Sequence, residues 1–242
     1  MKTLLVTRSR PGADEQAAKL RALGFGGLVE PLLHIEYVSA PEISLDGAQG
    51  LVVTSANALR AVELLPADAV PRSLPLYAVG DATAGHARRL GFTSVVAGPG
   101  DGEGLAALIV DGVKPGAGAL LHLCGERLAF DMAAALGARG YEMRGTVVYR
   151  AHDAGALSRR AREHIATGRL AGALLMSPAT AAVYAGVVAR AGLSDAARSM
   201  QYFCLSRNVA DRIAGLGLRH VNVAATPKED DLLALVSDRL AN

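Results

Sequence analysis

Hydroxyl and amide side chains recur where a short apolar run gives way to an alanine-rich stretch. Such runs favour a buried strand followed by a helix, so these polar residues would stand at helix starts. The first turn of a helix has free backbone N–H groups and a partial positive charge, which attract carboxylate or phosphate. The turns are Thr54-Ser55-Ala56-Asn57, Gly80-Asp81-Ala82-Thr83, Ser177-Pro178-Ala179-Thr180 and Ser206-Arg207-Asn208. The pattern predicts an anion-binding site, with ordinary helix capping as the alternative at each turn taken alone.

Arginines stand near the same places. Arg8, Arg127 and Arg207 each follow a predicted strand end, and a guanidinium makes bidentate contacts with carboxylates. A surface ion pair is the alternative for each of them. Cys124 also ends an apolar run, and we predict that it is a small buried residue rather than a reactive thiol.

Signatures of several other chemistries are missing from the sequence. It has no Gly-Lys-Ser/Thr phosphate loop and no Gly-x-Ser-x-Gly nucleophile turn. The glycines at 98, 100, 102 and 104 lack the dinucleotide-binding spacing, and we expect a flexible loop there. The six histidines show no zinc-like grouping with Cys or Glu. We therefore expect neither a metal nor a redox cofactor.

The elements that must position these residues alternate along the chain. Short apolar runs followed by helical stretches are typical of parallel α/β sheets covered on both faces. The pairs are Leu4–Arg8 with Gly12–Leu23, Leu51–Val53 with Ala56–Leu65, Leu76–Val79 with Ala82–Leu90, Ala119–Leu123 with Arg127–Arg139, Ala173–Met176 with Pro178–Ala191, Tyr202–Leu205 with Asn208–Leu216, and His220–Val223 with Lys228–Leu240.

Composition narrows the class of protein. Of the 242 residues, 51% are hydrophobic and 20% charged, with a net charge of +2, so neither a disordered chain nor a basic nucleic-acid binder is indicated. No apolar run approaches the roughly 20 residues of a membrane helix. The N-terminal run reads as a buried strand rather than a signal peptide. With only two distant cysteines, the expected compartment is the cytoplasm.

The pattern also repeats within the chain, which predicts two similar lobes. Val53-Thr54-Ser55-Ala56 aligns with Leu175-Met176-Ser177-Pro178, and the segment from Val79 to Ala84 aligns with that from Leu205 to Ala210. Glu30–Val38 and Glu142–Arg150 occupy matching places, and both look extended. We interpret them as connectors between the lobes.

These turns, in this order, resemble the uroporphyrinogen-III synthase family over nearly the whole chain. Each motif is weak alone, and the ordered set is fairly specific. The matching pieces are Thr7-Arg8, Thr54-Ser55-Ala56-Asn57-Ala58-Leu59, Val79-Gly80-Asp81-Ala82-Thr83-Ala84, Cys124-Gly125-Glu126-Arg127, Val148-Tyr149, Ser177-Pro178 and Val221-Asn222-Val223-Ala224-Ala225-Thr226-Pro227.

The resemblance implies two α/β lobes, each a parallel sheet flanked by helices, joined by a two-stranded connector. Lobe one would comprise residues 1–34 and 152–242, and lobe two residues 38–146. Residues 35–37 and 147–151 would be the connector strands.

The resemblance also implies the reaction. The family cyclises hydroxymethylbilane, a linear tetrapyrrole with many carboxylates, inverts the terminal pyrrole and loses water, without a cofactor. A cytoplasmic monomer is expected, with no membrane or nucleic-acid partner and with a transient contact to the preceding enzyme of the pathway. A non-catalytic two-lobed module that binds a small anion, or a regulatory relic of the fold, is the alternative.

By resemblance, Tyr149 is the candidate that assists departure of the hydroxyl group, with hinge packing as its alternative role. The turn from Ser206 to Val209 departs from the family pattern, which leaves its hydroxyl role open. The expected substrate-binding residues are Arg8, Ser55, Ala56, Asn57, Gly80, Thr83, Gly125, Arg127, Ser177, Ser206 and Asn208.

Overall fold

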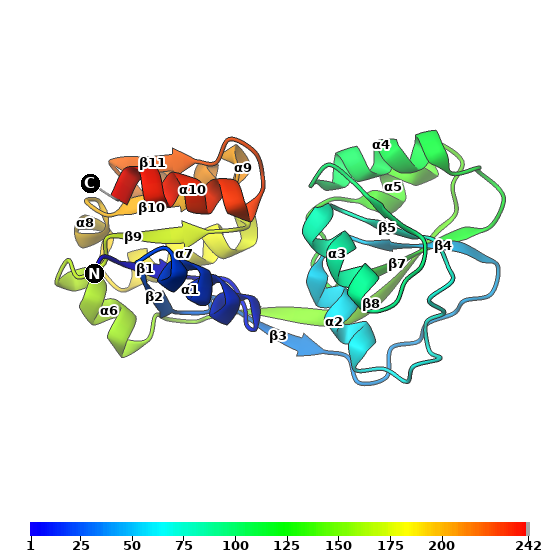
Figure 1. Cartoon of the computed structure of the whole chain (residues 1–242), viewed down its shortest axis with the longest axis horizontal. Coiled ribbons are helices and arrows are strands. Elements are labelled where there is room, and N and C mark those ends of the chain that lie inside the picture. Colours follow the sequence, from blue (N-terminus) through cyan, green and yellow to red (C-terminus); the bar gives the residue numbers. More distant parts are fainter. Residues whose placement is uncertain (241–242) are drawn as a thin grey trace. The chain divides into compact units, whose positions relative to one another are not determined.

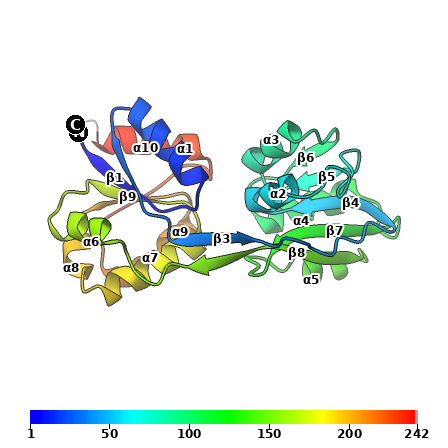
Figure 2. The same cartoon turned by 90° about the horizontal axis from the view of Figure 1, so that it is seen from below.

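The computed structural model describes residues 1–240, which divide into two compact units (Figures 1 and 2). Unit 1 contains residues 1–34 and 152–240, and unit 2 contains residues 35–151. Unit 1 is therefore discontinuous in sequence, and the chain crosses between the units at residues 34–35 and again at 151–152.

Unit 1 is built on a sheet with the strand order β11-β10-β9-β1-β2, in which every neighbouring pair is parallel. Figure 1 shows its N-terminal strands, in blue, in the same sheet as strands from the second half of the chain. The strands are β1 (Thr3–Val6), β2 (Gly26–Val29), β9 (Gly172–Leu175), β10 (Gln201–Cys204) and β11 (His220–Val223).

Helices cover both faces of this sheet because alternate strand residues point to opposite sides. Leu4 and Val6 pack with α1 and α10, whereas Leu5 packs with α6, α7 and α9. Figure 2 shows α1 and α10 on one face and α6 to α9 on the other. The helices are α1 (Gly12–Ala22), α6 (Arg159–Ala166), α7 (Pro178–Arg190), α8 (Ser194–Ala197), α9 (Arg207–Asp211), the 3₁₀ turn η1 (Ala214–Leu216) and α10 (Glu229–Leu240).

Unit 2 has the strand order β3-β8-β7-β4-β5-β6, and its strands from β8 to β6 pair in parallel. Leu51 and Val53 pack with α2 and α3, whereas Val52 packs with α4 and α5. The elements are β3 (Leu33–Tyr37), β4 (Ala48–Val53), α2 (Ala56–Glu63), β5 (Leu76–Ala78), α3 (Asp81–Arg89), β6 (Val95–Ala97), α4 (Gly102–Gly112), β7 (Ala119–Gly125), α5 (Met132–Gly137) and β8 (Met143–Asp153).

The predicted class, α/β with parallel sheets flanked by helices, is confirmed. The two sheets also share one strand order: β11-β10-β9-β1-β2 in unit 1 corresponds to β6-β5-β4-β7-β8 in unit 2. The aligned segments around Val53 and Leu175 end the central strands β4 and β9. β3 and β8 are paired at the edge of the unit 2 sheet.

Two local predictions are wrong. The helix expected from Arg127 begins only at Met132, because Asp131 supplies the cap, and its carboxylate accepts from the Ala134 N–H at 2.9 Å. The loop expected over the four glycines ends early. Asp101 accepts from the Gly104 N–H at 2.8 Å and so starts α4 at Gly102. In both places an Asp cap, rather than the apolar pattern, decides where the helix begins.

No helix within residues 1–240 has both the length and the apolar character needed to span a bilayer.

At Gly172 the unit 1 sheet leaves no room for a side chain. A Cβ at this position would overlap the carbonyl oxygen of Gln201 on β10. We expect Gly172→Ala to lower the free energy of unfolding by about 1–3 kcal/mol through overpacking, measured by urea denaturation. The control is Gly145→Ala on β8, where a Cβ meets nothing within 4 Å. Equal stabilities of the two variants would contradict this account.

Candidate active site

The candidate site of unit 2 lies at the carboxyl ends of its parallel strands. β4 ends before Thr54, β5 ends before Val79 and Gly80, and β7 ends at Gly125. Because parallel strands end at the same edge of a sheet, the sequence-predicted turns of this unit are brought to one edge. β7, β4 and β5 are direct neighbours in the sheet, so their ends are adjacent.

Ser55 starts α2 in the predicted way. Its backbone is extended, with φ −153° and ψ 140°, and its hydroxyl oxygen accepts from the Asn57 N–H at 3.1 Å. Ala56 and Asn57 form the first turn of the helix. This is an ordinary cap in its geometry, and it also presents the positive end of a helix dipole at the strand edge.

Tyr149 lies against this turn. The Ser55 side chain is close enough to lower the pKa of the Tyr149 hydroxyl, and the Tyr149 ring covers Gly125, where a Cβ would lie 2.6 Å from Tyr149 Cζ. The pairing register between β7 and β8 shifts at this point, so that Gly125 pairs with Tyr149 while Cys124 pairs with Val147. A bulge of this kind redirects the following side chain. Gly125 is therefore needed for the ring to lie where it does.

Burial raises the pKa of the Tyr149 hydroxyl above its usual value of 10.0. The nearby Ser55 side chain lowers the pKa of this hydroxyl, and the nearby Cys124 raises it, as burial does. The raised pKa means that the phenol keeps its proton at neutral pH. Tyr149 is thus suited to donate a hydrogen bond or a proton, rather than to act as a base.

His122 supports the same turn from β7. Its Nε2 lies 3.1 Å from the Thr54 hydroxyl, and the side chain is only 4% exposed. Burial lowers the pKa of His122 to about 4, so the imidazole is neutral at pH 7. This bond ties β7 to the turn that carries Ser55. His122 was not among the expected site residues, because no local sequence pattern marks a single buried histidine as the partner of Thr54.

The next strand end brings two helix starts together. Gly80 precedes α3 with extended backbone, and a Cβ there would lie 3.2 Å from the Gly100 Cα before α4. Thr83 stands in the first turn of α3 and is 6% exposed. The Thr83 hydroxyl is thus part of a buried turn, whereas the Gly80 backbone lies at the carboxyl-end edge of the sheet.

Arg127 and Gly125 do not stand at a helix start, because α5 begins at Met132. Gly125 is the last residue of β7, and Arg127 is exposed in the segment that follows. Their substrate-binding roles remain predictions, and Gly125 has the clearer structural link, through Tyr149.

Unit 1 carries its own polar strand ends. Ser177 caps α7, accepting from the Thr180 N–H at 3.2 Å and donating to the Thr180 hydroxyl at 2.9 Å. Ser206 precedes the short helix α9 without a side-chain cap, and Asn208 is exposed in its first turn.

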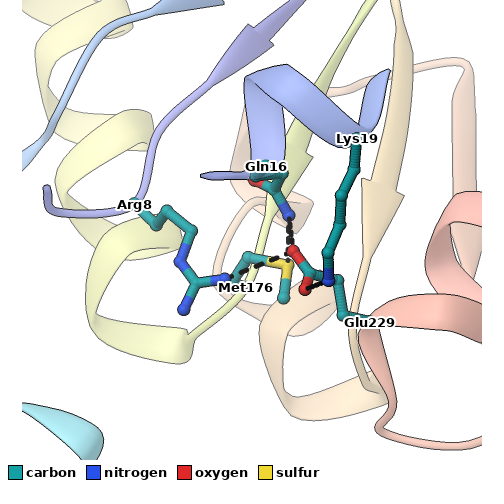
Figure 3. A network of polar contacts seen from close by, with 5 residues as sticks. All are labelled: Arg8, Gln16, Lys19, Met176 and Glu229. Atoms are coloured by element: carbon teal, nitrogen blue, oxygen red, sulfur yellow. Dashed lines mark hydrogen bonds and ion pairs between the residues drawn. The ribbon is translucent and has the colours of Figure 1, made fainter. Parts of the chain in front are cut away.

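Arg8, at the end of β1, belongs to a polar network within unit 1 (Figure 3). Glu229, the first residue of α10, accepts from Arg8 Nη1 at 3.3 Å and from Gln16 Nε2 at 3.0 Å, and it pairs with Lys19. The Gln16 amide also lies 3.2 Å from the Met176 sulfur. The structure thus gives Arg8 an internal carboxylate partner, so its positive charge is already partly compensated.

The fold and these strand ends place the chain among the α/β proteins whose parallel strands present a ligand site at their carboxyl ends. A family model described as Uroporphyrinogen-III synthase HemD matches residues 14–234. The chain belongs to this uroporphyrinogen-III synthase family.

Solved structures of similar proteins share the fold. A crystal structure of uroporphyrinogen-III synthetase from Helicobacter pylori matches with a TM-score of 0.65 and 15% identity, covering 98% of this chain and 99% of that one. A mutant uroporphyrinogen III synthase from Thermus thermophilus matches with a TM-score of 0.61 and 18% identity, covering 100% and 99%. At these identities the likeness establishes a common fold.

The pKa of His122 predicts how stability depends on pH. The unfolded chain binds a proton at the ordinary His pKa of 6.5, whereas folded His122 binds one only near pH 4. The free energy of unfolding therefore falls as pH drops through this window, by at most about 1.4 kcal/mol per pH unit. We expect His122→Gln, which does not titrate, to show a shallower fall in urea denaturation between pH 7 and 4.5.

The control for this experiment is His220→Gln, which removes an exposed histidine at the start of β11 and should keep the wild-type slope. Parallel curves for wild type and His122→Gln would mean that His122 contributes no pH dependence.

Proposed function

We propose that this chain performs its family's reaction. It closes hydroxymethylbilane into uroporphyrinogen III, inverting the terminal pyrrole and releasing water, as a lyase that needs no cofactor. The family match over residues 14–234 is the observation that carries this proposal. The strand ends described above then supply the groups that such a reaction requires.

The substrate's chemistry fits those strand ends. A tetrapyrrole with many carboxylates needs several fixed donors, and helix starts offer backbone N–H groups that do not have to be ordered on binding. Ser55, Ala56 and Asn57 at α2 and Gly80 at α3 provide them in unit 2. Ser177 at α7 and Ser206 with Asn208 at α9 provide them in unit 1.

Tyr149 is the group that we assign to the departing hydroxyl. A hydroxyl leaves as water only when it gains a proton or a strong hydrogen bond, and a phenol that keeps its proton at pH 7 is able to supply one. Ser55 lies near the Tyr149 hydroxyl, and the Gly125 backbone leaves room for the ring. The cationic tetrapyrrole formed next must be held in one shape, because spontaneous closure yields the isomer without inversion.

The cellular setting stays a prediction. Cys124 and Cys204 are both buried and unpaired, which is typical of a reducing compartment such as the cytoplasm. Burial raises the pKa of both thiols, in line with the prediction of an unreactive Cys124. A monomeric state and a transient contact with the preceding enzyme of the pathway are further predictions.

The isomer produced tests the proposed function directly. We expect the purified chain to convert hydroxymethylbilane mainly into the type III isomer, measured by chromatography after oxidation to porphyrins. The control without protein gives the type I isomer by spontaneous closure. Binding of the bilane with only type I product would indicate a non-catalytic binding module and reject the enzyme assignment.

Tyr149→Phe tests the assigned proton donor. We expect kcat to fall by about 10²-fold, the lower range for loss of a general acid, with KM nearly unchanged because the ring and its packing on Gly125 remain. Tyr77→Phe on β5 is the matched control, since Tyr77 packs with the α4 side of the same sheet. An unchanged kcat in Tyr149→Phe would remove the phenol from the mechanism.

A further inference from the structure

Arg60 is an arginine whose charge the described part of unit 2 does not neutralise. It lies on α2, about one turn after the Ser55 cap, and it is half-buried. Its Nη1 donates to the Asn57 side-chain oxygen at 3.0 Å. Within residues 1–240 it has no carboxylate within salt-bridge distance. By contrast, Arg8 pairs with Glu229 and Arg150 pairs with Glu126.

The helical spacing of α2 places Arg60 on the polar side of the helix. Asn57, Arg60 and Glu63 are spaced three residues apart on α2 and form its polar side, whereas Ala58, Leu59, Ala61 and Val62 are buried. Glu63 would be the natural internal partner, but its carboxylate lies 3.2 Å from His86 Nε2 on α3. Asn57 thus holds the guanidinium with a neutral acceptor and leaves its charge available.

Tyr37 connects this arginine with the candidate site. It packs against the same apolar cluster as Tyr149, from β3, which neighbours β8. The Val38 N–H donates to the Val148 carbonyl at 3.0 Å, which fixes the two strands beside each other. Burial raises the pKa of Tyr37, nearby Arg60 lowers it, and Glu63 and Tyr149 raise it. The Tyr149 phenol and the Arg60 guanidinium are therefore both within electrostatic reach of Tyr37.

We propose that Arg60 binds a carboxylate on the reacting end of the linear tetrapyrrole, next to the hydroxyl that Tyr149 helps to remove. Asn57 is the positioning residue that holds the guanidinium, and Tyr37 is a second donor beside it. This inference rests on the proposed function and adds to it the residue that orients the pyrrole to be inverted. A partly desolvated guanidinium with no anion beside it among residues 1–240 is a strong binding site for a carboxylate, because its planar fork donates to both carboxylate oxygens at once.

Holding that carboxylate would restrict rotation of the terminal pyrrole, which is the motion that separates the two isomers. Loss of Arg60 should therefore weaken binding and also lower the type III fraction. A residue that only stabilises α2 would change neither quantity while the protein stays folded.

The test compares Arg60→Gln, Arg60→Lys and the control Arg89→Gln, an exposed arginine at the far end of α3. We expect Arg60→Gln to raise KM for hydroxymethylbilane on the order of 10-fold, the effect of losing one charged hydrogen-bonded contact, with kcat changed less. Arg60→Lys keeps the charge without the planar fork and should give an intermediate KM. Arg89→Gln should match wild type.

Asn57→Asp provides a second, independent test. It keeps an acceptor for Arg60 and gives it an internal carboxylate, and a negative charge at a helix start stabilises the fold. We expect its KM to rise as in Arg60→Gln, because the guanidinium is then neutralised. The same change made in the Arg60→Gln background reports only repulsion between the new carboxylate and the substrate, and it should raise KM by a smaller factor. Melting temperatures of all variants check that they remain folded.

Unchanged KM and isomer ratio in Arg60→Gln would overturn the inference, since Arg60 would then be a solvated surface charge. That outcome differs from failure of the proposed function, in which wild type itself yields no type III isomer. A wild type that makes type III and an Arg60→Gln variant with raised KM and more type I product would support both.

Discussion

Parallel pairing of β4 with β7 is the constraint on which the candidate site depends. It puts the end of β4, with Thr54 and Ser55, beside the end of β7, with Gly125. The His122–Thr54 bond fixes this pairing at the site's edge. β8 then adds Tyr149 on the other side of β7, and the register shift at Gly125 turns its ring toward Ser55. A phenol, a helix start and a glycine backbone meet because β4 and β7 end side by side, while β8 continues beyond the end of β7 and carries Tyr149 there.

Charge is distributed unevenly around these strand ends. Arg8 is held by Glu229, whose carboxylate also joins Gln16 and Lys19, so this network ties β1 and α1 to α10. Among residues 1–240, the acceptor that Arg60 contacts is the neutral Asn57 side-chain oxygen. A carboxylate of the protein competes with an anionic ligand for the same cation. A neutral acceptor orients the cation without compensating its charge. The two arginines therefore differ in the side chains that the fold places beside them: a carboxylate for Arg8 and an amide for Arg60.

The shared strand order explains why both units carry polar turns at matching places. β1 and β2 stand in unit 1 where β7 and β8 stand in unit 2, although β1 and β2 come first in the chain. Each sheet is completed by segments that are far apart in sequence. The same edge of each sheet thus receives helix starts, Ser55 in one unit and Ser177 in the other, with similar caps.

The sequence by itself determined the α/β class, the strand–helix pairs and the caps at Ser55 and Ser177, because apolar period and capping chemistry are local. It also carried the family resemblance that singled out Tyr149. It misplaced the start of α5, since the cap at Asp131 outweighs the helical pattern before it. Only the tertiary structure decided that His122 contacts Thr54 and that Glu229 pairs with Arg8. It also decided that Arg60 contacts Asn57 and no carboxylate in the described part of the chain. Some of these contacts join residues from distant parts of the chain. Others depend on which of several nearby carboxylates reaches a given cation. Local sequence spacing predicts neither.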